Sequence, residues 1–123
     1  MKNIGVTIGL ALLAAVTPAL AGQSTPSQVF VTGNNAYGSV LGARYALDFN
    51  QFIGCTTTLG GGDFQLAQCF AENAAGTLLT CTTTDTNLVQ IAGRVNNTSF
   101  IEFYVSGSTC TSIRVANLSS NIN

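Results

Sequence analysis

The sequence predicts an α+β domain: a small antiparallel sheet of about five or six strands, made of a meander and a C-terminal hairpin, with one helix near residues 85–95. Three observations support this class. Short runs rich in β-branched and aromatic residues alternate with glycine and asparagine turns, one segment has helical periodicity, and four cysteines occupy matching positions on the expected strands. We therefore expect disulfides to staple a small fold.

Residues 1–21 have the pattern of a secretory signal peptide. Lys2 precedes an apolar run from Ile4 to Val16, and the small residues of Ala19-Leu20-Ala21 form a typical cleavage site. A membrane anchor is the alternative, but the run is shorter than the about 20 apolar residues that a spanning helix needs. We expect cleavage after residue 21, no membrane span in the mature chain, and a secreted protein in the extracellular space or at the cell surface.

The expected mature chain, from Gly22, is long enough for one domain with a modest core. It has three arginines, five carboxylates, no lysine and no histidine, which gives a net charge of −2. Three scattered arginines do not form the basic face that a nucleic-acid binder needs, so we exclude nucleic acid as a partner. Seven Phe and three Tyr argue against disorder. So few charges also do little to repel copies of the same chain.

Residues 51–84 contain three of the four cysteines and read as a three-stranded meander with turns at residues 60–63 and 73–76. A first hairpin centred on Gly62 places Cys55 opposite Cys69, and a second centred on Ala75 places Cys69 opposite Cys81. The three sulfur atoms then fall in one row across the sheet. The same face carries a small apolar set that could form a core: Ile53, Ala67, Ala71 and Leu79.

The cysteines are expected to form disulfides. Directly opposed cysteines of an antiparallel pair can be bridged, so Cys69 can join either Cys55 or Cys81, and the remaining cysteine pairs with Cys110. Four cysteines allow three connectivities, and the sequence alone does not choose among them. We favour Cys55–Cys69 with Cys81–Cys110. In an exported chain this use of cysteine is more common than metal binding, so we expect no metal site.

Residues 22–36 are expected to be a flexible N-terminal segment in front of a single disulfide-bonded globular domain, residues 37–123. Within this segment Val29-Phe30-Val31-Thr32 reads as a short strand. It is either the ordinary first strand of the sheet or a strand that pairs with a neighbouring molecule. Between residues 37 and 50, the near alternation of apolar residues after Tyr45 predicts one or two further strands, with Arg44 in solvent.

The segment after the meander has the signals of a helix. Capping side chains occur at residues 84–87, and apolar residues follow at helical spacing, which predicts a helix from about Asp85 to Val95. Its apolar stripe consists of Leu88, Ile91, Ala92 and Val95.

Residues 99–106 and 110–117 then read as a hairpin centred on Ser108. This register matches two apolar pairs and one charge pair: Ile101 with Val115, Phe103 with Ile113, and Glu102 with Arg114.

No pattern in the chain indicates catalysis. The absence of histidine excludes Ser-His and Cys-His dyads, and the five carboxylates are single and spread out. We expect no enzymatic activity and no cofactor. The runs Thr56-Thr57-Thr58 and Thr82-Thr83-Thr84 could form an ice-binding array, but threonine simply favours strands.

The chain resembles small exported four-cysteine proteins of Gram-negative bacteria. The resemblance rests on the run from Gln51 to Cys55, on Cys69-Phe70-Ala71, on Cys81 with the threonines after it, on Ser99 to Phe103, and on Cys110 with Ile113, Val115 and Asn117. It implies a bacterial exported protein, suggests subunits of extracellular filaments, and brings no catalytic residues.

Two classes of function follow. The first is a secreted structural subunit that self-assembles, with copies of itself as partners, into an extracellular fibre or surface layer. Its assembly strand would be Val29, Phe30, Val31 and Thr32, which we expect to leave the body of the domain at little cost in packing and to pair with the next molecule. The alternative is a monomeric secreted binding module, such as an adhesin, an inhibitor or an ice-binding protein.

Overall fold

The computed structural model describes residues 26–121, so the expected signal peptide lies outside the described residues. The described part is mostly β, with two short α-helices and one 3-10 helix. In chain order the elements are β1 (Phe30–Val31), β2 (Asn35–Ser39), α2 (Val40–Arg44), β3 (Phe52–Leu59), β4 (Gln65–Glu72), β5 (Leu78–Thr83), α3 (Thr86–Ala92), β6 (Ser99–Ser106), β7 (Thr109–Asn117) and η3 (Ser119–Asn121).

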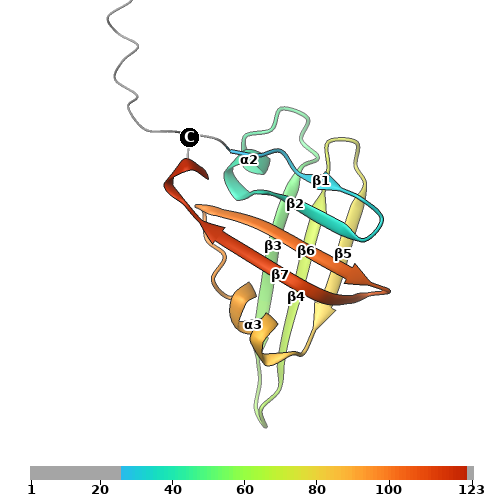
Figure 1. Ribbon diagram of the computed structural model, residues 1–123, viewed down its shortest axis with the longest axis vertical. Coiled ribbons are helices and arrows are strands. Elements are labelled where there is room, and N and C mark those ends of the chain that lie inside the picture. Colours follow the sequence, from blue (N-terminus) through green and yellow to red (C-terminus); the bar gives the residue numbers. More distant parts are fainter. Residues whose placement is uncertain (1–25, 122–123) are drawn as a thin grey trace, which may run out of the picture.

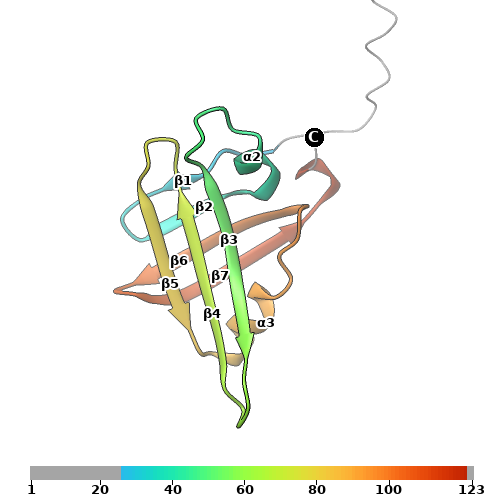
Figure 2. The same cartoon turned by 180° about the vertical axis from the view of Figure 1, so that it is seen from behind.

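The strands form two crossing layers. β3, β4 and β5 run side by side, and β6 and β7 cross them together with β2 (Figures 1 and 2). The hydrogen-bonded order is β1-β2-β6-β7-β5-β4-β3, and the layers join where β5 pairs with β7 in parallel, at Thr82 and Thr109. The sheet is therefore seven-stranded and mixed, which corrects our expectation of five or six purely antiparallel strands. The parallel contact arises because the turn between β6 and β7 lies against β5: the Thr82 N–H donates to the Ser108 carbonyl at 2.9 Å.

The meander has the register expected from its turns. Cys55 lies opposite Cys69, Cys69 lies opposite Cys81, and the row of three cysteines is confirmed. The turns reverse the chain at residues with positive φ, Gly62 at 69° and Gly76 at 87°, a conformation that glycine adopts without strain. The core side of this layer is small and apolar: Ile53, Ala67, Cys69, Ala71 and Cys81 are buried.

The C-terminal hairpin also keeps its expected pairs. Ile101 lies opposite Val115 and Phe103 opposite Ile113, and Arg114 lies 3.9 Å from Glu102 in an ion pair. The register then shifts between Tyr104 and Val105, so that Val105 pairs with Cys110. Because side chains alternate faces along a strand, this one-residue bulge turns the Cys110 side chain into the core.

Helix α3 is shorter than expected, Thr86–Ala92 in place of about Asp85–Val95. The Asp85 carboxylate caps it by accepting hydrogen bonds from the N–H groups of Asn87 and Leu88, at 3.0 and 3.1 Å. The expected apolar stripe faces the core: Ala92 is buried, and Leu88, Ile91 and Val95 are partly buried against the core. The prediction did not include Val89, which is also buried.

Residues 37–50 differ most from expectation. β2 ends at Ser39, whose side chain accepts a hydrogen bond from the Gly42 N–H at 3.0 Å and so starts the five-residue helix α2. Arg44 is exposed, as expected. The alternating residues after it, Tyr45, Leu47 and Phe49, form an exposed loop where we expected a strand. They run past the end of the sheet (Figure 1), and none of the strands in the described part of the chain pairs with them.

Candidate assembly surfaces

The two disulfides are the pair that we favoured. Cys55–Cys69 staples β3 to β4 within one layer, whereas Cys81–Cys110 joins β5 to β7 and so ties the two layers together. Cys55 is half-buried, and the other three cysteines are buried. The sulfur atoms of Cys69, Cys81 and Cys110 lie within 4.8 Å of one another, as metal ligands can. All of them are bonded in disulfides, so their role in this structure is covalent stapling.

The expected assembly strand, Val29–Thr32, pairs within its own molecule. β1 is antiparallel to β2, with Phe30 opposite Tyr37 and Val31 opposite Ala36. The Val29 side chain is only 3% exposed and belongs to the core, and its N–H donates to the Gln51 side-chain oxygen at 2.8 Å. Withdrawal of this strand would expose Val29. The assumption that the strand leaves at little cost in packing was therefore wrong.

The residues before β1 are also held by the domain. Three hydrogen bonds join Ser27 to Ser39: both the Ser39 N–H and the Ser39 hydroxyl donate to the Ser27 carbonyl, and the Ser27 N–H donates to the Ser39 hydroxyl. A Cβ on Gly42 would lie 2.2 Å from the Ser27 carbonyl oxygen, so α2 needs glycine there to let this chain pass. From Pro26 onward, the segment that we expected to be flexible is packed on the domain.

Strand β3 is a long edge of the sheet. Within the described residues it pairs only with β4, and no other backbone hydrogen bond reaches residues 52–59. Four consecutive residues, Thr56–Leu59, are exposed. The strand contains no charged residue and no proline, which are the usual devices that protect a sheet edge from pairing with another chain.

Residues 45–50 form what we call the apical loop, which lies at one end of the longest axis of the molecule (Figure 1). Leu47 is 90% exposed and Phe49 is 95% exposed. Asp48, between them, organises the loop: its carboxylate accepts hydrogen bonds from the Gln51 side-chain amide at 2.7 Å and from the N–H groups of Asn50 and Gln51 at 2.8 and 3.1 Å. These bonds, first that of the Gln51 side chain and then that of the Asn50 N–H, hold the pKa of Asp48 below its usual value.

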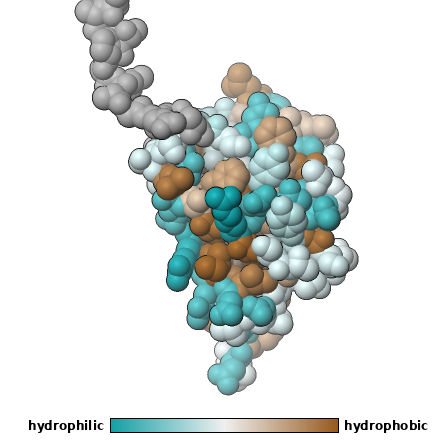
Figure 3. Space-filling view, viewed as in Figure 1, coloured by the Kyte–Doolittle hydropathy of each residue, from teal (hydrophilic) through white to brown (hydrophobic). Residues whose placement is uncertain are grey.

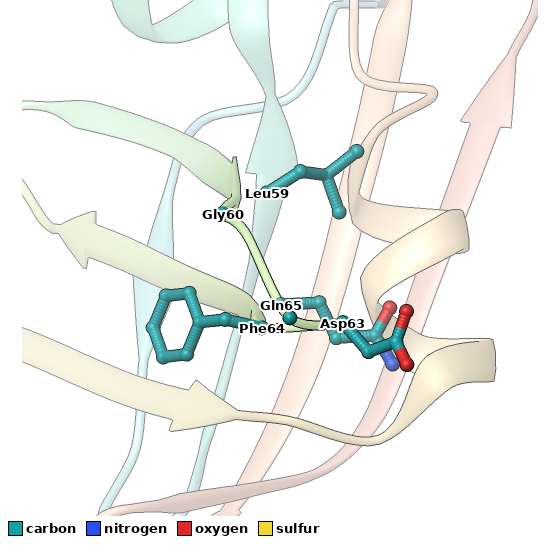
Figure 4. Close-up of a pocket in the computed structure, with 6 residues that line it drawn as sticks. Leu59, Gly60, Asp63, Phe64 and Gln65 are labelled. Atoms are coloured by element: carbon teal, nitrogen blue, oxygen red, sulfur yellow. The ribbon is translucent and has the colours of Figure 1, made fainter.

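The tip of the β3–β4 hairpin lies at the opposite end of the same axis (Figure 1). An open hollow of about 490 Å³ occurs there, lined by Leu59, Gly60, Gly62, Asp63, Phe64 and Gln65 (Figure 4). We call it the tip hollow. Leu59 is 78% exposed and Phe64 is 51% exposed. Gln65 anchors the tip to α3 by donating a hydrogen bond to the Thr86 hydroxyl at 2.6 Å.

A row of aromatic residues crosses the outer side of the β1, β2 and β6 strands. The Phe30 ring stacks on Tyr37 at 5.2 Å, Tyr37 lies 6.3 Å from Phe100, and the Arg114 guanidinium lies 6.0 Å from the Phe100 ring. Figure 3 shows this side of the molecule, where apolar side chains adjoin one another near the middle of the face and hydrophilic ones surround them.

The threonine runs do not form a continuous array. The outer-facing Thr56 of β3 and Thr82 of β5 are separated by Gln68 of β4, which pairs with both. Thr83 is buried on the other face. The arrangement therefore lacks the flat, unbroken threonine surface that ice binding requires.

Sequence reasoning did not identify four of these surfaces: the open edge of β3, the aromatic row, the apical loop and the tip hollow. The loop was read as a strand because its apolar residues alternate, and the tip was read only as a turn signal. None of the helices among residues 26–121 is long and apolar enough to cross a membrane. Comparisons with family models, curated proteins and solved structures gave no match for this chain.

Proposed function

We propose that this chain is a non-catalytic structural subunit that assembles with copies of itself into an extracellular fibre or surface layer. The observation that carries the proposal is the open edge of β3. Unpaired backbone groups on an edge strand can accept a strand from another molecule, and most monomeric proteins block such edges with charge, proline or a bulge. β3 has eight residues and none of these blocks.

The rest of the surface supports the same proposal. Five carboxylates and three arginines are the only charged groups from Gly22 onward, so long-range repulsion between copies is weak. Large apolar side chains are exposed at both ends of the long axis, at Leu47, Phe49 and Leu59. The two disulfides are consistent with an oxidising, extracellular location.

Strand donation is one route of assembly, with Val29–Thr32 of one copy as donor and β3 of the next copy as acceptor. The donor must first leave β2, which exposes Val29 and breaks the hydrogen bonds between Ser27 and Ser39. The route therefore requires that the new contacts on β3 replace those lost in the donor molecule.

The test places charge on the open edge. In the Thr56→Lys, Thr58→Lys double variant, two lysines project from β3, and charged edge side chains disfavour addition of another strand. The matched control is Gln68→Lys, on the same outer face of β4, because β4 pairs with β3 on one side and with β5 on the other and offers no open edge. Electron microscopy of the chain from Gly22 to Asn123 should show filaments or layers for the wild type and for the control, and isolated particles for the edge variant.

The experiment distinguishes failure of the subunit proposal from failure of strand addition at β3. If the wild-type chain remains monomeric at every concentration, the proposed function is wrong. If the wild type and the edge variant both assemble, the subunit proposal stands and strand addition at β3 is wrong.

A monomeric binding module is the second candidate, and one observation favours it. The row of Phe30, Tyr37 and Phe100, with Arg114 at its end, combines aromatic rings and a cation on one side of the sheet, as recognition surfaces often do. A monodisperse small particle in the same micrographs would favour this candidate.

A further inference from the structure

We infer that Cys55 is a modification site for small thiols. Cys69, which this modification releases from its bridge, then attacks Cys81 and opens the second bridge. Both steps are thiol–disulfide exchanges in the folded chain. The products are a mixed disulfide at Cys55, a new bridge between Cys69 and Cys81, and a free thiol at Cys110. This inference does not depend on the proposed function.

The two bridges differ in their access to a thiol in solution. Cys55 is half-buried and lies on the edge strand β3. The other three cysteines are almost inaccessible: Cys69, Cys81 and Cys110 are 0%, 1% and 2% exposed. No strand of the described residues flanks β3 on its outer side. Because the rate of exchange depends on access to the attacked sulfur, a thiolate in solution should react at Cys55 before any other cysteine.

The first step forms the mixed disulfide. The thiolate of the small thiol attacks the Cys55 sulfur, a new S–S bond forms there, and the bond to Cys69 breaks. The bonding electrons leave with Cys69, which becomes a thiolate. One disulfide replaces another, so the step needs no oxidant and no reductant other than the small thiol itself.

The second step follows from the position of Cys69 beside the other bridge. The sulfur atoms of Cys69, Cys81 and Cys110 lie within 4.8 Å of one another. Cys69 also lies directly opposite Cys81 in the β4–β5 ladder. Directly opposed residues have Cα atoms about 4.5–5.5 Å apart, a separation that a disulfide spans. The Cys69 thiolate attacks the Cys81 sulfur, the bond to Cys110 breaks, and Cys110 leaves as a thiolate that takes a proton from water.

The second step also prolongs the modification. A Cys69 thiolate that finds no other disulfide attacks Cys55 again, re-forms the original bridge and expels the small thiol. Once Cys69 is bonded to Cys81, this return is blocked until Cys110 attacks the new bridge and reverses the transfer. The neighbouring bridge therefore acts as an acceptor that keeps the small thiol on Cys55.

The exchange changes which parts of the fold are joined covalently. The bridge from Cys81 to Cys110 ties the two layers together across 29 residues. A bridge from Cys69 to Cys81 lies inside the meander and closes a much shorter loop. A shorter loop constrains the unfolded chain less, so the modified protein should denature at a lower urea concentration.

The test maps the disulfides after exposure to glutathione, which serves as the small thiol. The oxidised chain from Gly22 to Asn123 is incubated with glutathione at mildly alkaline pH, quenched with acid at intervals and alkylated with N-ethylmaleimide. Chymotrypsin then separates the four cysteines, because an aromatic residue lies between each consecutive pair: Phe64, Phe70 and Phe103. Mass spectrometry of the unreduced peptides identifies each partner, and circular dichroism verifies that the chain stays folded.

We expect a product with glutathione on Cys55, a bridge from Cys69 to Cys81, and an alkylated Cys110. The matched control is the Cys81→Ser, Cys110→Ser double variant, which keeps the first bridge and lacks the acceptor. It should carry several-fold less glutathione on Cys55 than the wild type, because its Cys69 thiolate only returns to Cys55. If this variant fails to fold, wild type unfolded in urea replaces it as the control. The three sulfur atoms no longer converge there, so the Cys69–Cys81 product should lose its predominance.

Three outcomes would overturn the inference. Glutathione attached first to any cysteine other than Cys55, or to none while the chain is folded, would show that Cys55 is not the modification site. Glutathione on Cys55 beside an alkylated Cys69 and an intact second bridge would show that Cys69 does not attack that bridge. A new bridge from Cys69 to Cys110 would show that the attacked sulfur is not that of Cys81.

Discussion

The meander of β3–β5 and the apical loop contain similar apolar sequences but place them oppositely. Ile53 of β3 is buried, whereas Leu47, six residues earlier, is almost fully exposed. The two segments differ in whether a partner strand lies beside them. β3 pairs with β4 along its whole length, while residues 45–50 pass beyond the end of the sheet. An alternating pattern becomes a buried strand only where a partner strand lies beside it. Where none does, the same residues become a candidate contact surface.

The largest expected loss of stability comes from removing the disulfides. Replacing Cys81 and Cys110 by alanine removes the bridge between the layers, which spans 29 residues, and should lower the free energy of unfolding by about 4 kcal/mol. Replacing Cys55 and Cys69, 14 residues apart in one hairpin, should cost about 3 kcal/mol. Urea denaturation measures both. A larger loss for the hairpin pair would contradict the assigned role of Cys81–Cys110.

The next prediction compares the loss of stability when a buried or an exposed apolar side chain is shortened. Ile53→Ala leaves a cavity in a packed core and should destabilise the domain by about 2–5 kcal/mol. Leu47→Ala removes an exposed side chain and should change stability by less than about 0.5 kcal/mol. Thermal or urea unfolding of the two variants compares them. Equal losses would show that the apical loop is packed after all.

A smaller effect concerns the cap of α3. Asp85→Ala removes the acceptor of two backbone hydrogen bonds and should cost about 1 kcal/mol. Asp63→Asn is the matched loss of an acidic side chain in the hairpin tip, which caps no helix, and asparagine tolerates the positive φ of 64° at this position. Helix loss seen by circular dichroism at low denaturant should occur for the first variant alone.

The smallest effect is the titration of Asp48. Because its folded pKa lies below the usual 3.8, its contribution to stability is fully present above the usual value and is lost as the pH falls through the lower, folded pKa. Protonation should release the N–H groups of Asn50 and Gln51 and loosen the apical loop. An NMR titration measures this, and a midpoint for Asp48 at or above 3.8 would contradict the hydrogen bonding described here.

Much of the fold could be predicted where local signals agreed. Centring the two hairpins of the meander on Gly62 and Ala75 correctly predicted the row of three cysteines. Centring the C-terminal hairpin on Ser108 correctly predicted that Glu102 lies opposite Arg114. The bulge after Tyr104 could not be predicted from local signals. It turns the Cys110 side chain toward the core, and the position of the core is known only from the folded structure.

The parallel contact between β5 and β7 was also beyond local signals, since it depends on how two layers cross. Of the candidate surfaces, the strand at Val29–Val31 was anticipated, but its burial was not. The exposure of Leu47 and Phe49 became visible only once the end of the sheet was known.

Sedimentation velocity of the chain from Gly22 to Asn123, with disulfides intact, tests the central claim most directly when it is run over a rising series of concentrations. If this chain is a subunit that assembles with copies of itself, the distribution should shift from monomer to a ladder of growing oligomers, without one preferred closed size. A single monomer peak that keeps its sedimentation coefficient at every concentration would contradict the claim.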